Sequence, residues 1–334
     1  NHVIYNKYRL ISKITEEQII RILRQTTLKN NSNLINDDVS VIGKHNGKIA
    51  INSDMLVEST DVPSQMTIRQ TARKSIIMAA SDFACKGILP KYFLLSLGIP
   101  KIFSRNQIKA LSRGIYDASS ELNISLLGGD TNSSLELIIN CIIIGFYTHK
   151  IPTRQKARPG DLIYVTGPFG LTGAGLFLLL NNHKPKTYFE KFAIKSVLEP
   201  RINLKICSEL TKNNLIHSSI DSSDGLALSL YSLAEESNVS ILLNKMPIAN
   251  GLNIFASKYN KCINDLILYS GEEYETIFTC SKKKSSLVEN ILNKLNIDYT
   301  NIGIVSSGKS KVYYKNKLIK RKGWDSFTHK LKSG

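Results

Sequence analysis

Short apolar segments alternate along this chain with segments of helical periodicity, and this alternation limits the folds available to it. In the first half the pattern predicts strands at residues 47–54, 91–100, 124–130 and 135–148, and helices at residues 67–87 and 104–123. In the second half it predicts strands at residues 161–167, 216–221, 239–244, 266–271, 274–280 and 299–306, and helices at residues 171–182, 225–238 and 285–296. Ser104 is the expected N-cap of its helix. The pattern has no fixed-period repeat, so it predicts an α+β protein.

A polar stretch with two prolines and a glycine, "HKIPTRQKARPGD", interrupts the alternation at residues 149–161. A chain of 334 residues is long enough for two ordinary domains, each with its own core. We therefore expect a domain break near residue 150, with an N-terminal domain at residues 1–149 and a C-terminal domain at residues 150–334.

The chain is strongly basic, with 44 Lys and Arg against 27 Asp and Glu and a formal net charge of +17. Such an excess suits anionic partners, among them nucleotides, phosphorylated metabolites and nucleic acids. The sequence contains no zinc-finger, RNP or helix-turn-helix signature, so nucleic acid is the less favoured partner. A general compositional bias toward Lys, Asn and Ile explains the charge about as well.

Composition also bears on the cellular compartment. No apolar run approaches the roughly 20 residues of a membrane helix, and the first residues show no apolar signal region before a small-residue cleavage site. The five cysteines are scattered and form no CxxC or Cys/His cluster, which is typical of buried thiols in a reducing compartment. We expect a cytoplasmic protein with no membrane partner.

Acidic residues recur at the ends of the apolar segments, where α/β proteins assemble their sites. They are Asp37, Asp38, Asp54, Asp130, Asp221, Glu272 and Glu273, and Asp82 joins them from a predicted helix. Taken alone, helix capping explains Asp224 and a turn explains Asp37. Two unit charges about 4 Å apart repel by about 4 kcal/mol at an effective dielectric near 20, so converging carboxylates need cations. Because no histidine accompanies them, Mg²⁺ and phosphoryl transfer are the natural interpretation.

The common nucleotide-binding motifs are absent. Residues 166–177, "TGPFGLTGAGLF", lie between a predicted strand and a predicted helix, but Leu176 and Phe177 follow Gly175 where a P-loop needs Lys and Ser or Thr. The segment does not fit GxGxxG, and the kinase HRD and DFG signatures are missing. We expect a tight turn followed by a closely packed helix.

Ten blocks, in chain order, carry a resemblance to a known family. They read "NDDVSVI", "NSDMLVEST", "ARKSIIMAASDFACKGILPKYFLLSLGIP", "LLGGDTN", "ARPGDLIYVTGPFGLTGAGL", "EPRINL", "IDSSDGLALSL", "SGEEYETIFTC", "IGIV" and "KGWDSF". Nearly the whole chain resembles thiamine-monophosphate kinases, ATP-binding members of the aminoimidazole ribonucleotide synthetase superfamily, and "VESTDVPSQMTIRQ" resembles their archaeal branch. The resemblance implies two α/β domains with mixed sheets packed by helices, and a homodimer built through the sheet of the N-terminal domain.

The activity that the resemblance implies is the conversion of thiamine monophosphate and ATP into thiamine diphosphate and ADP with several Mg²⁺ ions. The implied metal-binding residues are Asp38, Ser53, Asp54, Asp82, Asp130, Asp221 and Asp224. The implied nucleotide-binding residues are Gly129, Asp130, Arg154 and Ser223. The implied substrate-binding residues are Glu272, Trp324 and Asp61, the last at a position where bacterial members have histidine. No general base is expected, because the attacking phosphate oxygen is already ionised at neutral pH.

Alternatives stay open at this point. Another ATP-using member of the superfamily fits the same aspartates, although the segment "WDSFTHKLKSG" lacks the terminal cysteine that some members use. A non-catalytic nucleotide-binding relative fits them too, and a basic nucleic-acid-binding protein fits the net charge. For single residues, a solvated loop explains Arg154 and a core anchor explains Trp324 nearly as well.

Overall fold

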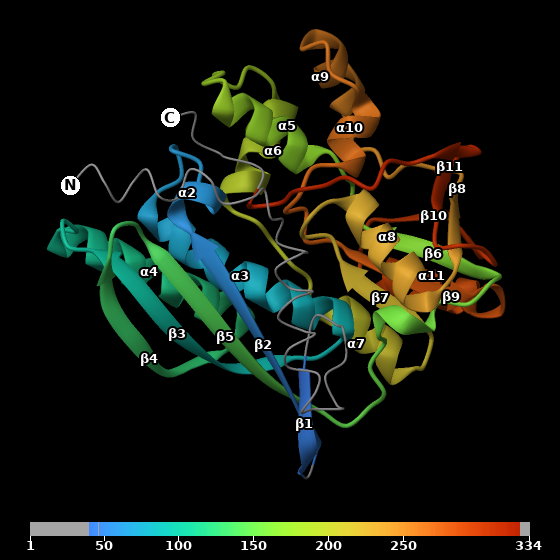
Figure 1. Ribbon diagram of the computed structural model, residues 1–334, viewed down its shortest axis with the longest axis horizontal. Coiled ribbons are helices and arrows are strands. Elements are labelled where there is room, and N and C mark those ends of the chain that lie inside the picture. Colours follow the sequence, from blue (N-terminus) through green and yellow to red (C-terminus); the bar gives the residue numbers. More distant parts are fainter. Residues whose placement is uncertain (1–39, 46, 328–334) are drawn as a thin grey trace, which may run out of the picture.

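A computed structural model describes residues 40–45 and 47–327 and places them around two separate β-sheets (Figure 1). The first sheet contains β1 (Ser40–His45), β2 (Gly47–Val57), β3 (Pro90–Pro100), β4 (Ser125–Ser134) and β5 (Ile138–Tyr147) in the order β1-β2-β5-β3-β4. Only its β3–β4 pair is parallel, so the sheet is mixed.

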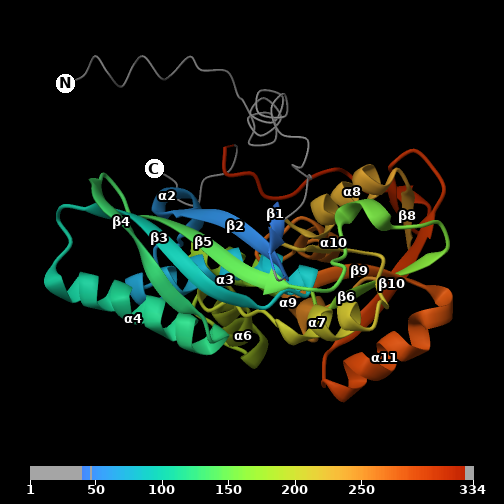
Figure 2. The same ribbon diagram turned by 90° about the horizontal axis from the view of Figure 1, so that it is seen from below.

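Two helices cover one face of the first sheet, α3 (Ile68–Lys86) and α4 (Arg105–Leu122) (Figure 2). Along β5 alternate side chains are buried against this pair, and those between them are at most half-buried. A capping box starts each helix, from Thr67 to Gln70 in α3 and from Ser104 to Gln107 in α4. The predicted N-cap at Ser104 is therefore confirmed.

The second sheet has seven strands in the order β12-β11-β8-β10-β6-β9-β7. They are β6 (Asp161–Thr166), β7 (Ser218–Asp221), β8 (Ser240–Leu243), β9 (Thr276–Ser281), β10 (Tyr299–Ser306), β11 (Val312–Tyr314) and β12 (Lys317–Leu318). β8 and β11 pair in parallel and the other pairs are antiparallel.

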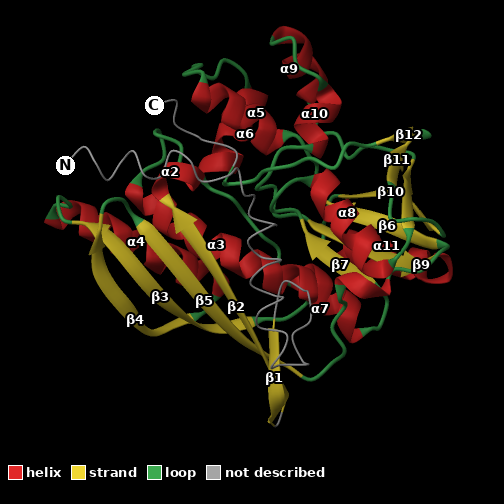
Figure 3. Ribbon diagram, viewed as in Figure 1, coloured by secondary structure: helices red, strands yellow, loops and turns green. Residues whose placement is uncertain are grey.

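Helices cover both faces of this sheet (Figure 3). They are α5 (Leu171–Leu180), α6 (Tyr188–Leu198), α7 (Lys205–Lys212), α8 (Leu226–Ser237), α9 (Leu252–Lys258), α10 (Ile263–Leu268) and α11 (Ser285–Lys294). Short helices α2 (Glu58–Asp61), η2 (Arg154–Lys156) and η3 (Lys282–Lys284) complete the elements of the described residues. One core includes α5, α8, α9 and α10, and another includes α7 and α11. The expected α+β class with mixed, helix-packed sheets is confirmed.

One predicted strand is wrong. Residues 266–271 form the end of helix α10 and a loop. Leu266, Ile267 and Leu268 are all buried, and a short run buried on every side has no period that separates a strand from a helix. The prediction for residues 166–177 is confirmed, because a Cβ added to Gly175 would lie 2.1 Å from the carbonyl oxygen of Ala193 on α6.

The division into domains stays a prediction. β5 ends at Tyr147 and β6 begins at Asp161, so the sheets use opposite sides of the expected boundary. Helix α3 belongs to the first sheet, yet its buried Lys86 donates from Nζ to the carbonyl oxygen of Ser219 on β7, at 2.7 Å. Within the described residues no helix is both long and apolar enough to span a bilayer.

Candidate active site

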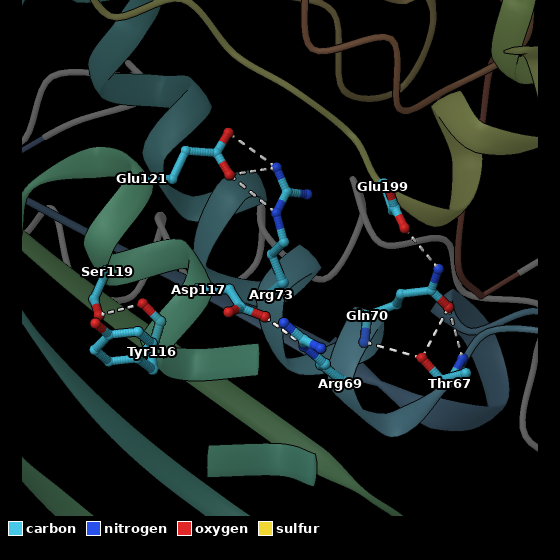
Figure 4. Close-up of polar contacts among 9 residues, drawn as sticks. All are labelled: Thr67, Arg69, Gln70, Arg73, Tyr116, Asp117, Ser119, Glu121 and Glu199. Atoms are coloured by element: carbon cyan, nitrogen blue, oxygen red, sulfur yellow. Dashed lines mark hydrogen bonds and ion pairs between the residues drawn. The ribbon is translucent and has the colours of Figure 1, made fainter. Parts of the chain in front are cut away.

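Helix α3 lies between the two sheets and carries several of the site's polar side chains (Figure 1). Ion pairs on its first turns fix it to α4: Arg69 contacts Asp117 at 2.6 Å and Arg73 contacts Glu121 at 2.7 Å (Figure 4). Gln70 donates to Glu199 at 3.1 Å, which ties the helix to the segment after α6. The helix is therefore held from both halves of the chain, so its side chains have defined positions.

Asp221 ends strand β7 and is buried, as the sequence pattern of an acid after an apolar strand predicted. Ser81 of α3 donates from its hydroxyl to the Asp221 carboxylate at 2.7 Å. Burial raises the pKa of Asp221, while the Ser81 hydrogen bond and the charges of Arg154 and Lys86 act in the opposite direction. Two cations thus face this carboxylate from different elements.

Asp54 and Asp82 lie on the α3 side of the first sheet. Asn52 of β2 donates to the Asp82 carboxylate, and Asp54 stands two residues further along the same face. The charges of Asp221 and Asp82 both act on the buried Cys85 thiol, whose pKa burial raises well above its usual value. Asp54 acts in the same direction on Cys141, directly opposite it on β5. These three carboxylates therefore gather around one end of α3.

Tyr274 is a site residue that sequence reasoning missed. It is buried, has a positive φ of 52°, and donates its backbone N–H to the Ser222 carbonyl at 3.1 Å. Burial raises its pKa well above the usual value, and the nearby charges of Glu272, Asp54, Asp61 and Asp221 raise it further. The ring therefore lies among carboxylates from both halves of the chain. An aromatic residue between glutamates carries no sequence signal for this role.

Glu272 pairs with Lys74, a lysine of α3 whose side chain is fully buried. Lys74 also donates to the Asp61 carbonyl oxygen at 2.7 Å, so one ammonium group joins two predicted substrate residues. The Asp61 carboxylate itself accepts the Val57 N–H at 2.7 Å, at the start of α2. Glu272 adopts a left-handed φ of 66°, which costs free energy for a residue with a Cβ. Sequence reasoning missed Lys74, since a lysine in a helix is usually solvated.

A cavity of about 320 Å³ opens beside this pair. Apolar side chains of α5 and α10 form its walls, among them Leu176, Phe177 and Leu266, and Glu272 and Trp324 also line it. Trp324 is positioned by its backbone N–H, which donates to the Asp224 carbonyl at 2.9 Å. Glu272 and Trp324, two of the three predicted substrate residues, thus share one pocket. It has the size and apolar lining of a small-molecule site.

Ser223 and Asp224 form the loop that connects Asp221 to α8. Ser223 accepts the Glu272 N–H on its carbonyl at 2.6 Å, so this loop is joined to the loop that carries the substrate residues. The Asp224 side chain is exposed. Arg154 on η2 approaches Ser232 of α8 at 3.5 Å and acts electrostatically on Asp221, which places it near the buried carboxylate.

Within one chain, Ser53 and Asp130 do not lie with Asp54 on the face of the first sheet that α3 covers. Ser53 donates to Asn140 at 3.0 Å on the opposite face of the sheet, the face with the less buried side chains of β5. Asp130 is exposed on β4 and lies in register with Ser96 of β3, which in turn faces Asn140 of β5. Gly129 precedes it, and a Cβ there would lie 1.8 Å from the Leu95 carbonyl oxygen, so only glycine fits.

Within residues 47–327 no three His, Cys, Asp or Glu side chains form a group that could hold a metal by themselves. Asp38 lies outside the described residues. Asp54, Asp82 and Asp221 nevertheless offer only oxygen donors at one end of α3, and burial penalises the negative charge of Asp221. That donor set suits a hard cation whose remaining ligands are waters and phosphate oxygens.

The comparisons with known proteins address the whole chain. Residues 36–147 match the family described as AIR synthase related protein, N-terminal domain, and residues 158–315 match the corresponding C-terminal domain. Thiamine-monophosphate kinase from Nitrosopumilus maritimus (strain SCM1) is 36% identical over 95% of this chain and 100% of its own length. The chain belongs to the thiamine-monophosphate kinase family. The family resemblance seen in the sequence is thereby confirmed.

Two further relatives of the thiamine-monophosphate kinase family agree. The enzyme of that name from Pyrococcus horikoshii is 32% identical over 91% of this chain and 92% of its own length. The solved structure named "AaThiL complexed with AMPPCP and TMP" superposes with a TM-score of 0.85 at 27% identity, covering 94% of this chain and 98% of that one. Its name states that this kinase binds an ATP analogue together with TMP.

Proposed function

We propose that this chain is a thiamine-monophosphate kinase, which transfers the γ-phosphoryl group of ATP to thiamine monophosphate and releases thiamine diphosphate and ADP. The observation that carries the proposal is the cavity lined by Glu272 and Trp324. The cavity opens beside the ion pair of Glu272 with Lys74, and Lys74 lies on α3, the helix that also carries Asp82. Binding of an ATP analogue and TMP by a structural relative supports both substrates.

The chemistry asks little of the protein beyond alignment and charge balance. A phosphate oxygen of thiamine monophosphate is the nucleophile, and it needs no general base because it is ionised at neutral pH. It would attack the γ-phosphorus in line, and the bond to the ADP oxygen would break as the new P–O bond forms. Arg154, through its charge near Asp221, would hold nucleotide phosphates at that end of α3.

Mg²⁺ ions are part of the proposal. Asp54, Asp82 and Asp221 would hold them, with Asp38, Ser53, Asp130 and Asp224 as further ligands that the family resemblance implies. When bound, Mg²⁺ would neutralise the phosphate charges that the two substrates bring together. The chain's own contribution is the Ser81 hydroxyl, which fixes the Asp221 carboxylate by donating to it at 2.7 Å.

The organic part of the substrate would occupy the apolar cavity. Trp324 offers an aromatic face to the cationic thiazolium ring, and Leu176 and Phe177 form the wall around it. Glu272 would contact the substrate while Lys74 keeps its charge compensated. Asp61 would act through its neighbour, because Thr60 lines the cavity and Asp61 does not.

The nucleotide would be bound by Arg154 and Ser223, with Gly129 and Asp130 reaching it from β4. Within one chain β4 lies three strands away from β2, roughly 14 Å at the usual strand spacing. We therefore include a homodimer in the proposal, with the exposed face of the first sheet as its interface. A cytoplasmic location completes it, since ATP and a phosphorylated metabolite are the substrates.

One assay tests the function directly. Purified chain, ATP, Mg²⁺ and thiamine monophosphate should yield thiamine diphosphate, measured by chromatography. We expect Asp221→Asn to keep the fold and to lose at least about 100-fold of the turnover, because the Asp221 charge is no longer there to hold a cation. Glu209→Gln removes an acid from the exposed ion pair with Lys212 on α7 and should keep normal turnover.

Three results would count against the proposal, two against the function and one against the role of Asp221. ATP binding without thiamine diphosphate would indicate a non-catalytic relative or a different acceptor substrate. Normal turnover by the Asp221→Asn variant would remove Asp221 from the metal site while leaving the kinase activity standing. Salt-sensitive binding of generic nucleic acid without ATP turnover would favour a nucleic-acid-binding protein.

A further inference from the structure

A second, smaller cavity lies on residues 148–160, the joining segment between β5 of the first sheet and β6 of the second. Its volume is about 100 Å³, well below the roughly 300–1,000 Å³ of sites for larger ligands. Four of its nine lining residues are basic: Lys150, Lys156 and Arg158 from the segment between β5 and β6, and His217 immediately before β7. None of these residues is among those to which the family resemblance assigns a role.

The cations at this cavity are not neutralised by the protein. Within residues 47–327, the side chains of Lys150, Lys156 and Arg158 form no ion pair, and all three residues are exposed. The nearby carboxylate of Asp161 is occupied, because it accepts from His217 Nδ1 at 2.9 Å and from the Arg158 backbone N–H at 3.0 Å.

The end of helix α7 borders this cavity. Thr211 and Asn214 line the cavity, and a helix C-terminus normally presents free carbonyl groups with partial negative charge. In this case Asn214 N–H donates to Thr211 and Leu215 N–H donates to Leu210, and Lys284 donates to the Asn214 carbonyl at 2.6 Å. The carbonyl groups of Leu210, Thr211 and Asn214 are therefore hydrogen-bonded, which reduces the opposition of this helix end to an anion.

We propose that this cavity, with Lys150, Lys156 and Arg158 at its rim, binds a phosphate group. An arginine and two lysines lining a volume of about 100 Å³ match a small tetrahedral oxyanion in charge and size. The ligand is either free phosphate or the phosphate group of a larger molecule that extends into solvent. Phosphate binding at this cavity would account for part of the excess of basic residues in the chain.

A bound anion would also fix the nucleotide side of the active site. The same segment carries Arg154, which does not line the cavity but contacts Ser232 and acts through its charge on Asp221. Thr153 bridges to Ser218 on β7, and His217 immediately precedes that strand. A bound phosphate group would therefore connect the joining segment to β7, the strand that ends in Asp221.

Titration calorimetry with inorganic phosphate, at constant ionic strength set by NaCl, tests the proposal on the full chain. We expect one phosphate bound at this cavity, with affinity weakened about tenfold or more in Lys156→Ala/Arg158→Ala, which loses two charged donors. Lys101→Ala/Arg105→Ala removes the same two charge types from exposed positions near the start of α4 and should bind like the wild type. Phenyl phosphate as titrant distinguishes a phosphate ester from free phosphate.

Hydrogen exchange supplies a readout specific to this place. Phosphate should slow amide exchange across residues 149–158 in the wild type and the control variant, and should fail to do so in Lys156→Ala/Arg158→Ala. Lys150→Ala, which removes a single cation, should give a smaller loss of affinity. Equal phosphate affinity in all variants, or protection confined to the active site, would overturn the proposal.

Discussion

At the scale of single residues, the site combines acids that sequence reasoning predicted with partners that it missed. Asp54 and Asp221 follow apolar strand segments, and the position of an acid at a strand end is readable from the sequence. Lys74 and Tyr274 gain their importance only from tertiary contacts, namely the ion pair with Glu272 and burial among four carboxylates. Ser53 is the opposite case, a residue predicted for the metal site that one chain does not bring there. Its side chain lies on one face of the sheet, and that of Asp54, the next residue, lies on the other.

Trp324 offers a sharp test at this scale. Trp324→Ala should raise the KM for thiamine monophosphate roughly 10- to 100-fold with little change in the KM for ATP, because only the apolar cavity proposed for thiamine loses an aromatic side chain. Steady-state kinetics with each substrate varied separately measures both constants. Trp324→Phe keeps an aromatic ring and should lose much less. An equal rise in both KM values would show that Trp324 supports the fold and has no specific role toward the substrate.

At the scale of elements, Glu273 links the substrate loop to helix α5. Its carboxylate accepts the backbone N–H groups of Gly170, at 2.7 Å, and Thr172, at 3.2 Å, and so caps the helix that forms the cavity wall. Burial raises the pKa of Glu273 to about 7, and the same cause raises the pKa of Glu275 to about 7. Both carboxyl groups therefore take up protons on folding near neutral pH.

This uptake predicts a pH dependence of stability. Between about pH 4.5 and pH 7 the folded chain holds protons that the unfolded chain has released, so the free energy of unfolding falls as pH rises through this window. Glu273→Gln keeps the acceptor oxygen and removes the titration, so its fall should be smaller by roughly 2 kcal/mol. Urea unfolding at several pH values from 5 to 8 measures the difference. Glu235→Gln, at an exposed glutamate, should leave the slope unchanged, and an unchanged slope in Glu273→Gln would contradict this account.

The elements themselves were largely predictable because local signals and packing agree in them. Ser104 with Gln107 encodes the start of α4, and the alternation in β2 and β5 encodes a sheet with one more deeply buried face. The failure at α10 came from a run buried on every side. The order of the strands has no such local signal, since β10 pairs with β6 and β8, which are far away in sequence. The cavity that Glu272 and Trp324 share likewise combines residues far apart in sequence, from Thr60 to Trp324.

At the scale of the whole molecule, the first sheet has an unusual exposed face. Sheets with one face on the core normally present polar residues on the other face. Here Met55 and Phe146 are 56% and 46% exposed, and Tyr92 packs edge-on against Phe146 with ring centroids 6.3 Å apart. Asp130 lies beyond them on β4, an edge strand whose first nine residues are all exposed. The proposed homodimer would cover this face with a second copy of the chain.

Replacing two of these apolar residues by acids should therefore separate the subunits. Wild-type chain should show twice its mass of 37.3 kDa by size-exclusion chromatography with light scattering. Met55→Glu/Phe146→Glu should shift to the single-chain mass, because burying two unpaired charges at an interface is strongly unfavourable. Ile108→Glu/Tyr116→Glu changes two exposed residues of α4, the helix on the opposite face, and should stay dimeric. If the separated chain kept full affinity for ATP, Gly129 and Asp130 would have no need of the dimer to reach the nucleotide.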